Sequence, residues 1–131
     1  MSLPLYILLC SGEHEKIQMA AMMSSVAAAS ERRVEVFLSM NAMYAFAREA
    51  PAAGRYRGGQ FAELFKGKNI PDAMSLFEMA KDVGECRVWA CSMAMGLLEW
   101  EVEDMVPGIV DGAAGLTKFM ADAEAGQLIS L

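Results

Sequence analysis

The sequence lacks the features that mark several large functional classes. It has 11 lysine and arginine residues against 17 acidic ones, and its net charge of −6 argues against nucleic acid and acidic membrane surfaces as main partners. No apolar run reaches the roughly 20 residues that span a bilayer, so we expect no membrane partner. GxGxxG, Walker A and nucleophile-elbow patterns are also missing. We therefore expect no cofactor.

Cysteine and histidine are scarce. Three cysteines without CxxC spacing and a single histidine make a disulfide framework or a structural zinc site improbable, so no metal site is expected. The odd cysteine count suits a reducing environment, and we expect the protein to be cytoplasmic. The 12 methionines are interpreted as adaptable core or interface packing rather than as copper ligands.

The residues that are present indicate a folded domain. A chain of 131 residues that is 55% hydrophobic is long enough for one real core and too short for two, so we expect a single domain over residues 1–131. The apolar stretch 3–10 has no basic segment before it, and it is interpreted as a first strand rather than a signal peptide. The mean hydropathy of +0.27 is high for a small monomer and favours a homo-oligomer.

Strand-like and helix-like segments alternate along the chain, which predicts a mainly parallel sheet covered by helices on both faces. The predicted strands are residues 3–10, 34–39, 86–91, 109–110 and 127–131. The predicted helices run from the Ser11-Gly12 break to about 30, and over residues 41–49, 72–84, 92–98 and 116–125. Ser11 or Gly12 is expected to cap the first helix, and Asp72 the third.

Residues 51–71 differ in kind from the rest of the chain. They hold four basic residues against the single acid Glu63, a local charge of +3, with glycines and prolines and one short helical turn expected over 61–65. This segment is either a solvated connection or a basic flap that meets an anionic ligand or an acidic partner.

Cys91 has the most informative position in the sequence. It ends the strand 86–91 and opens the helix 92–98, where the positive end of the helix dipole favours thiolate over thiol. Two other predicted strands end in Cys10-Ser11-Gly12 and Ser39-Met40-Asn41. Because parallel strands end at one edge of a sheet, these groups and Cys91-Ser92-Met93 are expected to share one pocket.

Each candidate also has a structural reading. Cys91 and Cys10 can be plain core cysteines, and Cys86, at the opposite edge of the sheet, is expected to be structural. His14 lies in the first turn of the first helix and is either a general acid or base or a surface histidine. Asn41 either donates hydrogen bonds to an anion or caps its helix.

Taken together, these segments resemble the DsrE/DsrF-like family of small sulfur-relay proteins, which are also labelled peroxiredoxin-like. The resemblance spans nearly the whole chain. Its matching parts are residues 5–12, 34–39 and, most specifically, 88–95, with softer matches at Glu103-Asp104-x-x-Pro107-Gly108 and Gly115-Leu116-x-x-Phe119.

The resemblance implies a three-layer α/β/α sandwich around a mainly parallel sheet of about five strands. It implies trimers or hexamers, a cysteine persulfide on Cys91, and a TusA-like or rhodanese-like sulfur-transfer partner. The family's active cysteine maps onto Cys91 alone, with Ser92 and Met93 beside it. Two alternatives stay open: a non-catalytic oligomeric binding module, and a thiol peroxidase in which Cys10 resolves Cys91.

Overall fold

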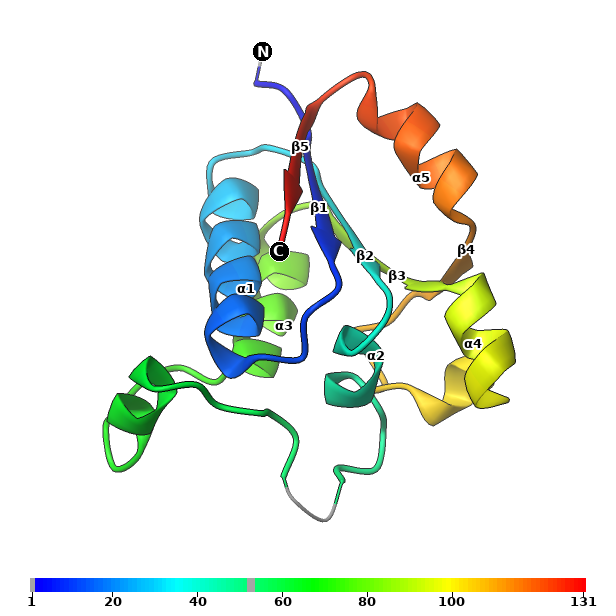
Figure 1. The fold of residues 1–131 in the computed structure, drawn as a ribbon. Helices are drawn as coiled ribbons and strands as arrows, with labels where there is room; N and C mark the ends of the chain where they lie inside the picture. Colours follow the sequence, from blue (N-terminus) through cyan, green and yellow to red (C-terminus); the bar gives the residue numbers. More distant parts are fainter. Residues whose placement is uncertain (1, 52–53) are drawn as a thin grey trace.

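Five parallel strands form the centre of the protein, seen here in a computed structural model that describes residues 2–51 and 54–131. Their order across the sheet is β4-β3-β2-β1-β5 (Figure 1). The strands are β1 (Leu5–Leu9), β2 (Val34–Leu38), β3 (Cys86–Cys91), β4 (Gly112–Ala114) and β5 (Gln127–Ser130). The predicted mainly parallel α/β sheet of about five strands is confirmed.

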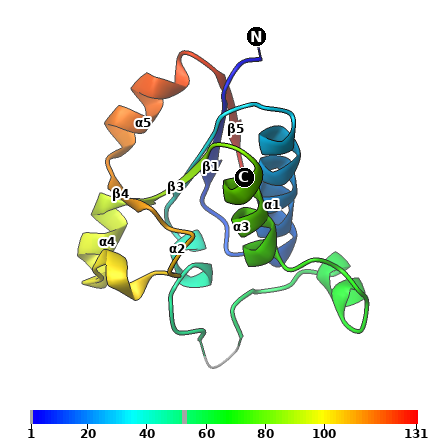
Figure 2. The ribbon, with the colours of Figure 1, turned by 180° about the vertical axis from the view of Figure 1, so that it is seen from behind.

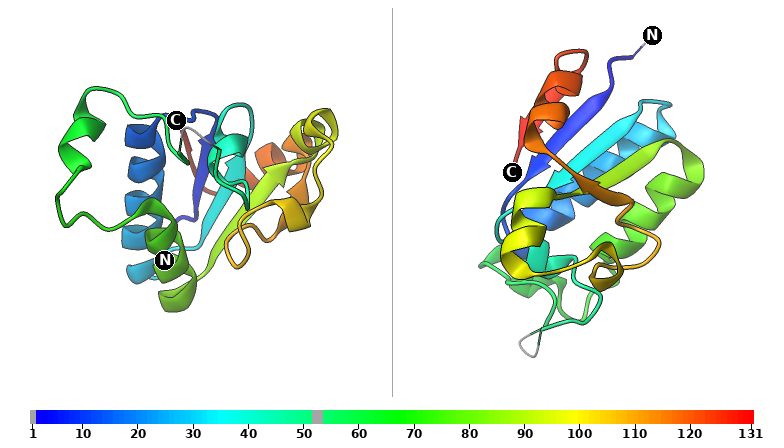
Figure 3. Two further views of the ribbon diagram at one scale, coloured as in Figure 1. Left: turned by 90° about the horizontal axis from the view of Figure 1, so that it is seen from below. Right: turned by 90° about the vertical axis from the view of Figure 1, so that its right-hand side faces the viewer.

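Helices cover both faces of this sheet, as predicted (Figures 1 and 2). One face carries α1 (His14–Ala29) and α3 (Ala73–Val83), and the other carries α4 (Ser92–Leu98) and α5 (Leu116–Ala123). The short helix α2 (Ala42–Ala45) lies at the carboxyl edge, and the 3₁₀ turns are η1 (Phe61–Phe65) and η2 (Val102–Asp104). The view from below the sheet separates these layers most clearly (Figure 3).

The core forms because alternate strand residues point to opposite faces. Ile7, Val36 and Val88 are fully buried and occupy matching positions in β1, β2 and β3. On the opposite face, Phe119 of α5 packs edge-on against Tyr6, with ring centroids 5.6 Å apart. It also packs against Phe37, with centroids 5.1 Å apart and the ring planes tilted by 35°. Both faces of the central strands are therefore apolar, which is why their sequences lack a polar alternation.

The predicted strand at residues 109–110 is wrong. The turn after Pro107 places Gly108 at a positive φ of 79°, and Ile109 enters the core from the turn instead of from a strand. The edge strand on this side of the sheet is β4. It pairs with β3, and Gly112 lies opposite Trp89. Small residues with low β-propensity form this strand, and its pairing with β3 therefore comes from the tertiary structure.

Two predicted helix boundaries also need correction. The predicted helix 41–49 ends at Ala45, because the Arg48 amide donates to the Asp104 carbonyl and the chain beyond α2 pairs with residues near η2. Helix α1 begins at His14 with Glu13 at its N-cap. Neither Ser11 nor Gly12 caps it, and the Ser11 hydroxyl instead accepts from the Glu13 amide at 3.0 Å. The predicted cap by Asp72 is confirmed.

The structure contains no helix that is long and apolar enough to span a membrane, within the residues it describes.

Candidate functional site

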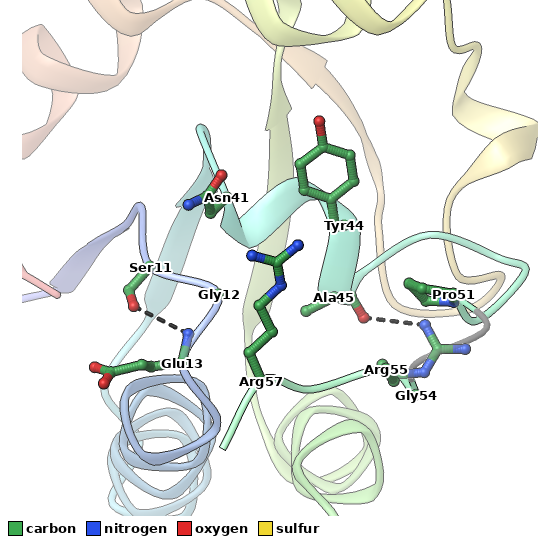
Figure 4. Close-up of a pocket in the computed structure, with 10 residues that line it drawn as sticks. All are labelled: Ser11, Gly12, Glu13, Asn41, Tyr44, Ala45, Pro51, Gly54, Arg55 and Arg57. Atoms are coloured by element: carbon green, nitrogen blue, oxygen red, sulfur yellow. Dashed lines mark hydrogen bonds between the residues drawn. The ribbon is translucent and has the colours of Figure 1, made fainter. Parts of the chain in front are cut away.

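The carboxyl ends of β1, β2 and β3 lie side by side, because these three strands are neighbours and parallel. A cavity of about 260 Å³ opens at this edge (Figure 4). Residues from the loop after β1, from the α2 region and from the basic segment (residues 51–71) line it. These lining residues are Ser11, Gly12, Glu13, Asn41, Tyr44, Ala45, Pro51, Gly54, Arg55 and Arg57. Three of the predicted site residues, Ser11, Gly12 and Asn41, thus meet in one pocket.

The third strand end does not line this cavity. Cys91 is the N-cap residue of α4 and is 5% exposed, whereas Ser92 and Met93 lie exposed in the first turn of that helix. The Tyr44 ring, which lines the cavity, meets edge-on the ring of Trp100 in the segment after α4, with centroids 6.0 Å apart. The prediction of one pocket shared by all three ends therefore holds for Ser11, Gly12 and Asn41. It does not hold for Cys10 or for Cys91, Ser92 and Met93, which do not line the cavity.

Cys10 and Cys91 lie on the same face of the sheet. Strand alternation places Cys91 with Trp89, and Cys10 with Tyr6, on the side that α5 covers. One strand lies between β1 and β3, so about 10 Å separates the two cysteine backbones. Burial raises the pKa of the Cys10 thiol, and the nearby charge of Cys91 raises it further.

Cys86 lies at the opposite edge of the sheet, as predicted. It is 4% exposed, and burial raises the pKa of its thiol to about 11. A thiol so placed stays protonated at neutral pH, which suits the structural role expected for it.

His14 fastens the basic segment to the start of α1 rather than lining the cavity. Its imidazole stacks on the Tyr56 ring, with centroids 4.2 Å apart, and meets the Phe65 ring edge-on at 4.9 Å. Burial lowers the pKa of His14, although the charges of Asp72 and Glu15 oppose that shift. The Tyr56 hydroxyl in turn donates to the Asp72 carboxylate at 3.0 Å. A neutral imidazole suits these contacts with the two aromatic rings.

The two arginines of the basic segment have different surroundings. The Arg55 guanidinium donates to the carbonyls of Ala45 at 3.0 Å and Ala47 at 2.5 Å, so it holds the chain that follows α2. The Arg57 guanidinium points into the cavity between Asn41 and Tyr44 (Figure 4). Its backbone is anchored separately, because its amide donates to the Gly12 carbonyl and its carbonyl accepts from the His14 amide.

Tyr44 was not among the predicted site residues. Its spacing was the available signal, because a residue three positions after Asn41 lies on the same side of a helical turn. In the described part of the chain, no three histidine, cysteine, aspartate or glutamate side chains gather so that they can hold a metal ion.

Comparisons with known proteins agree with this architecture. Residues 40–129 match the sequence profile of the DsrE/DsrF/DrsH-like family. A similar fold occurs in MTH1491 from Methanobacterium thermoautotrophicum, a protein of unknown function, with a TM-score of 0.65 and 13% sequence identity over 99% of this chain and 100% of that one. No curated protein matches the chain. The family match covers most of the sequence, and the chain therefore belongs to the DsrE/DsrF/DrsH-like family.

Proposed function

We propose that this protein carries sulfane sulfur as a persulfide on Cys91. The position of Cys91 is the main support, because its thiol ends β3 at the carboxyl edge of the sheet and occupies the N-cap of α4. Amide groups at the start of a helix stabilise negative charge on sulfur. The family is generally linked to sulfur relay, which agrees with a nucleophilic cysteine at this place.

The proposed transfer has two steps and needs no external oxidant. The Cys91 thiolate attacks the outer sulfur of a donor persulfide, R–S–SH, so that a new S–S bond forms on Cys91 while the donor's S–S bond breaks. The donor leaves as the thiolate R–S⁻, and the proton stays on the transferred sulfur. An acceptor thiolate then attacks the outer sulfur of Cys91. That step returns Cys91 to a thiolate and leaves the persulfide on the acceptor.

Cys10 suits a supporting role in this proposal. Burial and the charge of Cys91 both raise the pKa of the Cys10 thiol, which favours its protonated form. A protonated Cys10 does not compete with Cys91 as the nucleophile.

The burial of Cys91 implies that a partner takes part. Cys91 is 5% exposed, but the two residues after it, Ser92 and Met93, lie at the surface. We propose that a TusA-like or rhodanese-like protein docks against this first turn of α4 and displaces it enough to reach the sulfur. Such a relay needs reduced thiols, and this favours a reducing compartment such as the cytoplasm.

Intact mass spectrometry tests the persulfide directly. The protein is incubated with cysteine persulfide for long enough that the first turn of α4 opens on its own, and the wild type is expected to gain the mass of one sulfur atom that a thiol reductant removes. Cys91→Ser should lose this adduct, whereas Cys86→Ser, a matched change of a buried cysteine at the far edge, should keep it. An adduct that persists in Cys91→Ser, or its absence from the wild type, contradicts the proposal.

We also propose that the exposed apolar side of α1 joins copies of the chain. Met19, Met22 and Val26 are 47%, 45% and 68% exposed and lie along a hollow beside β5. Burial of such a stripe favours association by about 25 cal/mol for each Å² removed from water. Light scattering should give an oligomer that Met22→Glu weakens and Met120→Glu, on α5 in the opposite layer, does not. A wild-type monomer at micromolar concentration contradicts this proposal.

A further inference from the structure

We infer that the cavity between the loop after β1, α2 and the basic segment binds a small anion through Arg57. Its volume of about 260 Å³ lies just below the range of about 300–1,000 Å³ typical of pockets for drug-sized ligands, so the ligand is small. The cavity lies beyond the carboxyl ends of parallel strands, which is the usual place for ligands in open α/β sheets. The inference does not rest on sulfur transfer, because Cys91 does not line this cavity.

Arg57 supplies the charge. Among the described residues, no carboxylate forms an ion pair with its guanidinium, which points into the cavity. Glu13 also lines the cavity, but its carboxylate points away from that guanidinium (Figure 4). Arg55 already donates to backbone carbonyls, so it adds positive potential while Arg57 keeps donors for a ligand.

Neutral donors surround the same space. The Ser11 hydroxyl accepts from the Glu13 amide, which leaves its own O–H free to donate. Asn41 is the N-cap residue of α2, but its side chain makes no capping bond, so its amide can turn to a ligand. Tyr44 adds its aromatic ring to the wall, and its hydroxyl points away from the Arg57 guanidinium (Figure 4).

Gly12 lets these groups come together. A Cβ on this residue would lie 2.9 Å from the Asn41 carbonyl oxygen, closer than such atoms approach in proteins. The loop after β1 therefore passes the start of α2 at a distance that only glycine allows, and this brings Ser11 beside Asn41.

The donors define the class of ligand. A guanidinium presents a flat pair of N–H groups that matches two oxygens of a carboxylate or of a tetrahedral oxyanion, and the Asn41 amide and the Ser11 hydroxyl can take the remaining oxygens. We therefore assign the cavity to a small molecule with one such head group. Acetate represents the carboxylates, and phosphate, sulfate and thiosulfate represent the oxyanions.

Amide and arginine side-chain NMR shifts, recorded at constant ionic strength with each of the four salts, test the inference. At least one anion should shift the Gly12 and Asn41 amides and the Arg57 Nε signal along one saturable curve. Arg57→Gln should weaken this binding by about tenfold or more. The variant keeps the backbone bonds that anchor residue 57, so its fold should persist, and its unchanged spectrum elsewhere checks this.

Lys68→Gln is the matched control, because it removes the same charge from the same segment outside the cavity. It should change the dissociation constant less than twofold. The Asn41 side chain makes no capping hydrogen bond, so Asn41→Ala should weaken anion binding without unfolding α2. Saturable binding by none of the four anions overturns the inference. An equal loss in Lys68→Gln and Arg57→Gln also overturns it, because diffuse charge would then explain the attraction.

Discussion

The imidazole of His14 lies stacked on the phenol ring of Tyr56, with centroids 4.2 Å apart and planes 11° from parallel. The pair joins the first turn of α1 to a segment more than 40 positions later in the sequence. The backbone bond from the His14 amide to the Arg57 carbonyl, 2.8 Å long, lies directly beside it. The stack therefore positions the arginine that enters the cavity.

We expect this contact to weaken as the pH falls. Burial lowers the pKa of His14 below its ordinary value of about 6.5, so the unfolded chain takes up a proton before the folded protein does. Stability from this group is complete above that ordinary value, and it declines between it and the lower folded pKa. Urea unfolding at pH 8, 7, 6 and 5.5 measures the decline.

His14→Phe is the control for the pH effect, because it keeps an aromatic ring for stacking and cannot titrate. The pH dependence between 7 and 5.5 should become flatter in this variant. Equal slopes in the variant and the wild type would show that other groups, such as Asp72 or Glu15, cause the decline.

Removal of the Glu15 carboxylate should loosen η1. Its two oxygens accept from the Gly59 and Ala62 amides at 2.9 and 3.0 Å, and these bonds lower the pKa of Glu15. In Glu15→Ala, hydrogen exchange at those two amides should accelerate. Glu13→Ala, at the exposed neighbouring acid, should leave both rates unchanged, and acceleration in both variants would contradict the assignment.

Gly126→Ala should destabilise the protein by about 2 kcal/mol or more, a value typical of overpacking. A Cβ there would meet the Pro4 carbonyl oxygen and the Tyr6 ring, 2.8 Å away at its nearest carbon. Gly115→Ala provides the comparison, because its Cβ would meet nothing within 4 Å. Denaturant titration of the two variants should therefore differ by about the same 2 kcal/mol, and similar midpoints would refute the close packing at residue 126.

Peroxide should not produce a disulfide between Cys10 and Cys91. The two backbones lie about 10 Å apart across β2, beyond the roughly 7 Å that a disulfide can bridge without backbone movement. Non-reducing peptide mapping after mild oxidation should find both cysteines unlinked. A linked pair would restore the thiol peroxidase alternative, in which Cys10 resolves Cys91.

Local patterns in the sequence were sufficient for most of the architecture. Apolar stretches predicted β1, β2 and β3, and alternation with helices predicted their parallel arrangement. The strand predicted at residues 109–110 was wrong because Ile109 has a strand-like character but is buried from a turn. Strand β4 was missed for the opposite reason, since Gly112 and Ala113 have low strand propensity but pair with Trp89 and Ala90 of β3.

The sequence by itself determined that Cys10, Asn41 and Cys91 lie at strand ends on one edge of the sheet, because alternating strands and helices make the strands parallel. That these strands are neighbours was decided by the tertiary structure. Only the tertiary structure decided which of them face a cavity. Arg57 approaches that cavity from a distant segment, and Cys91 is buried under the first turn of α4. These positions are determined by contacts between residues far apart in sequence, such as the stack of His14 on Tyr56. Local structural propensity cannot predict such contacts.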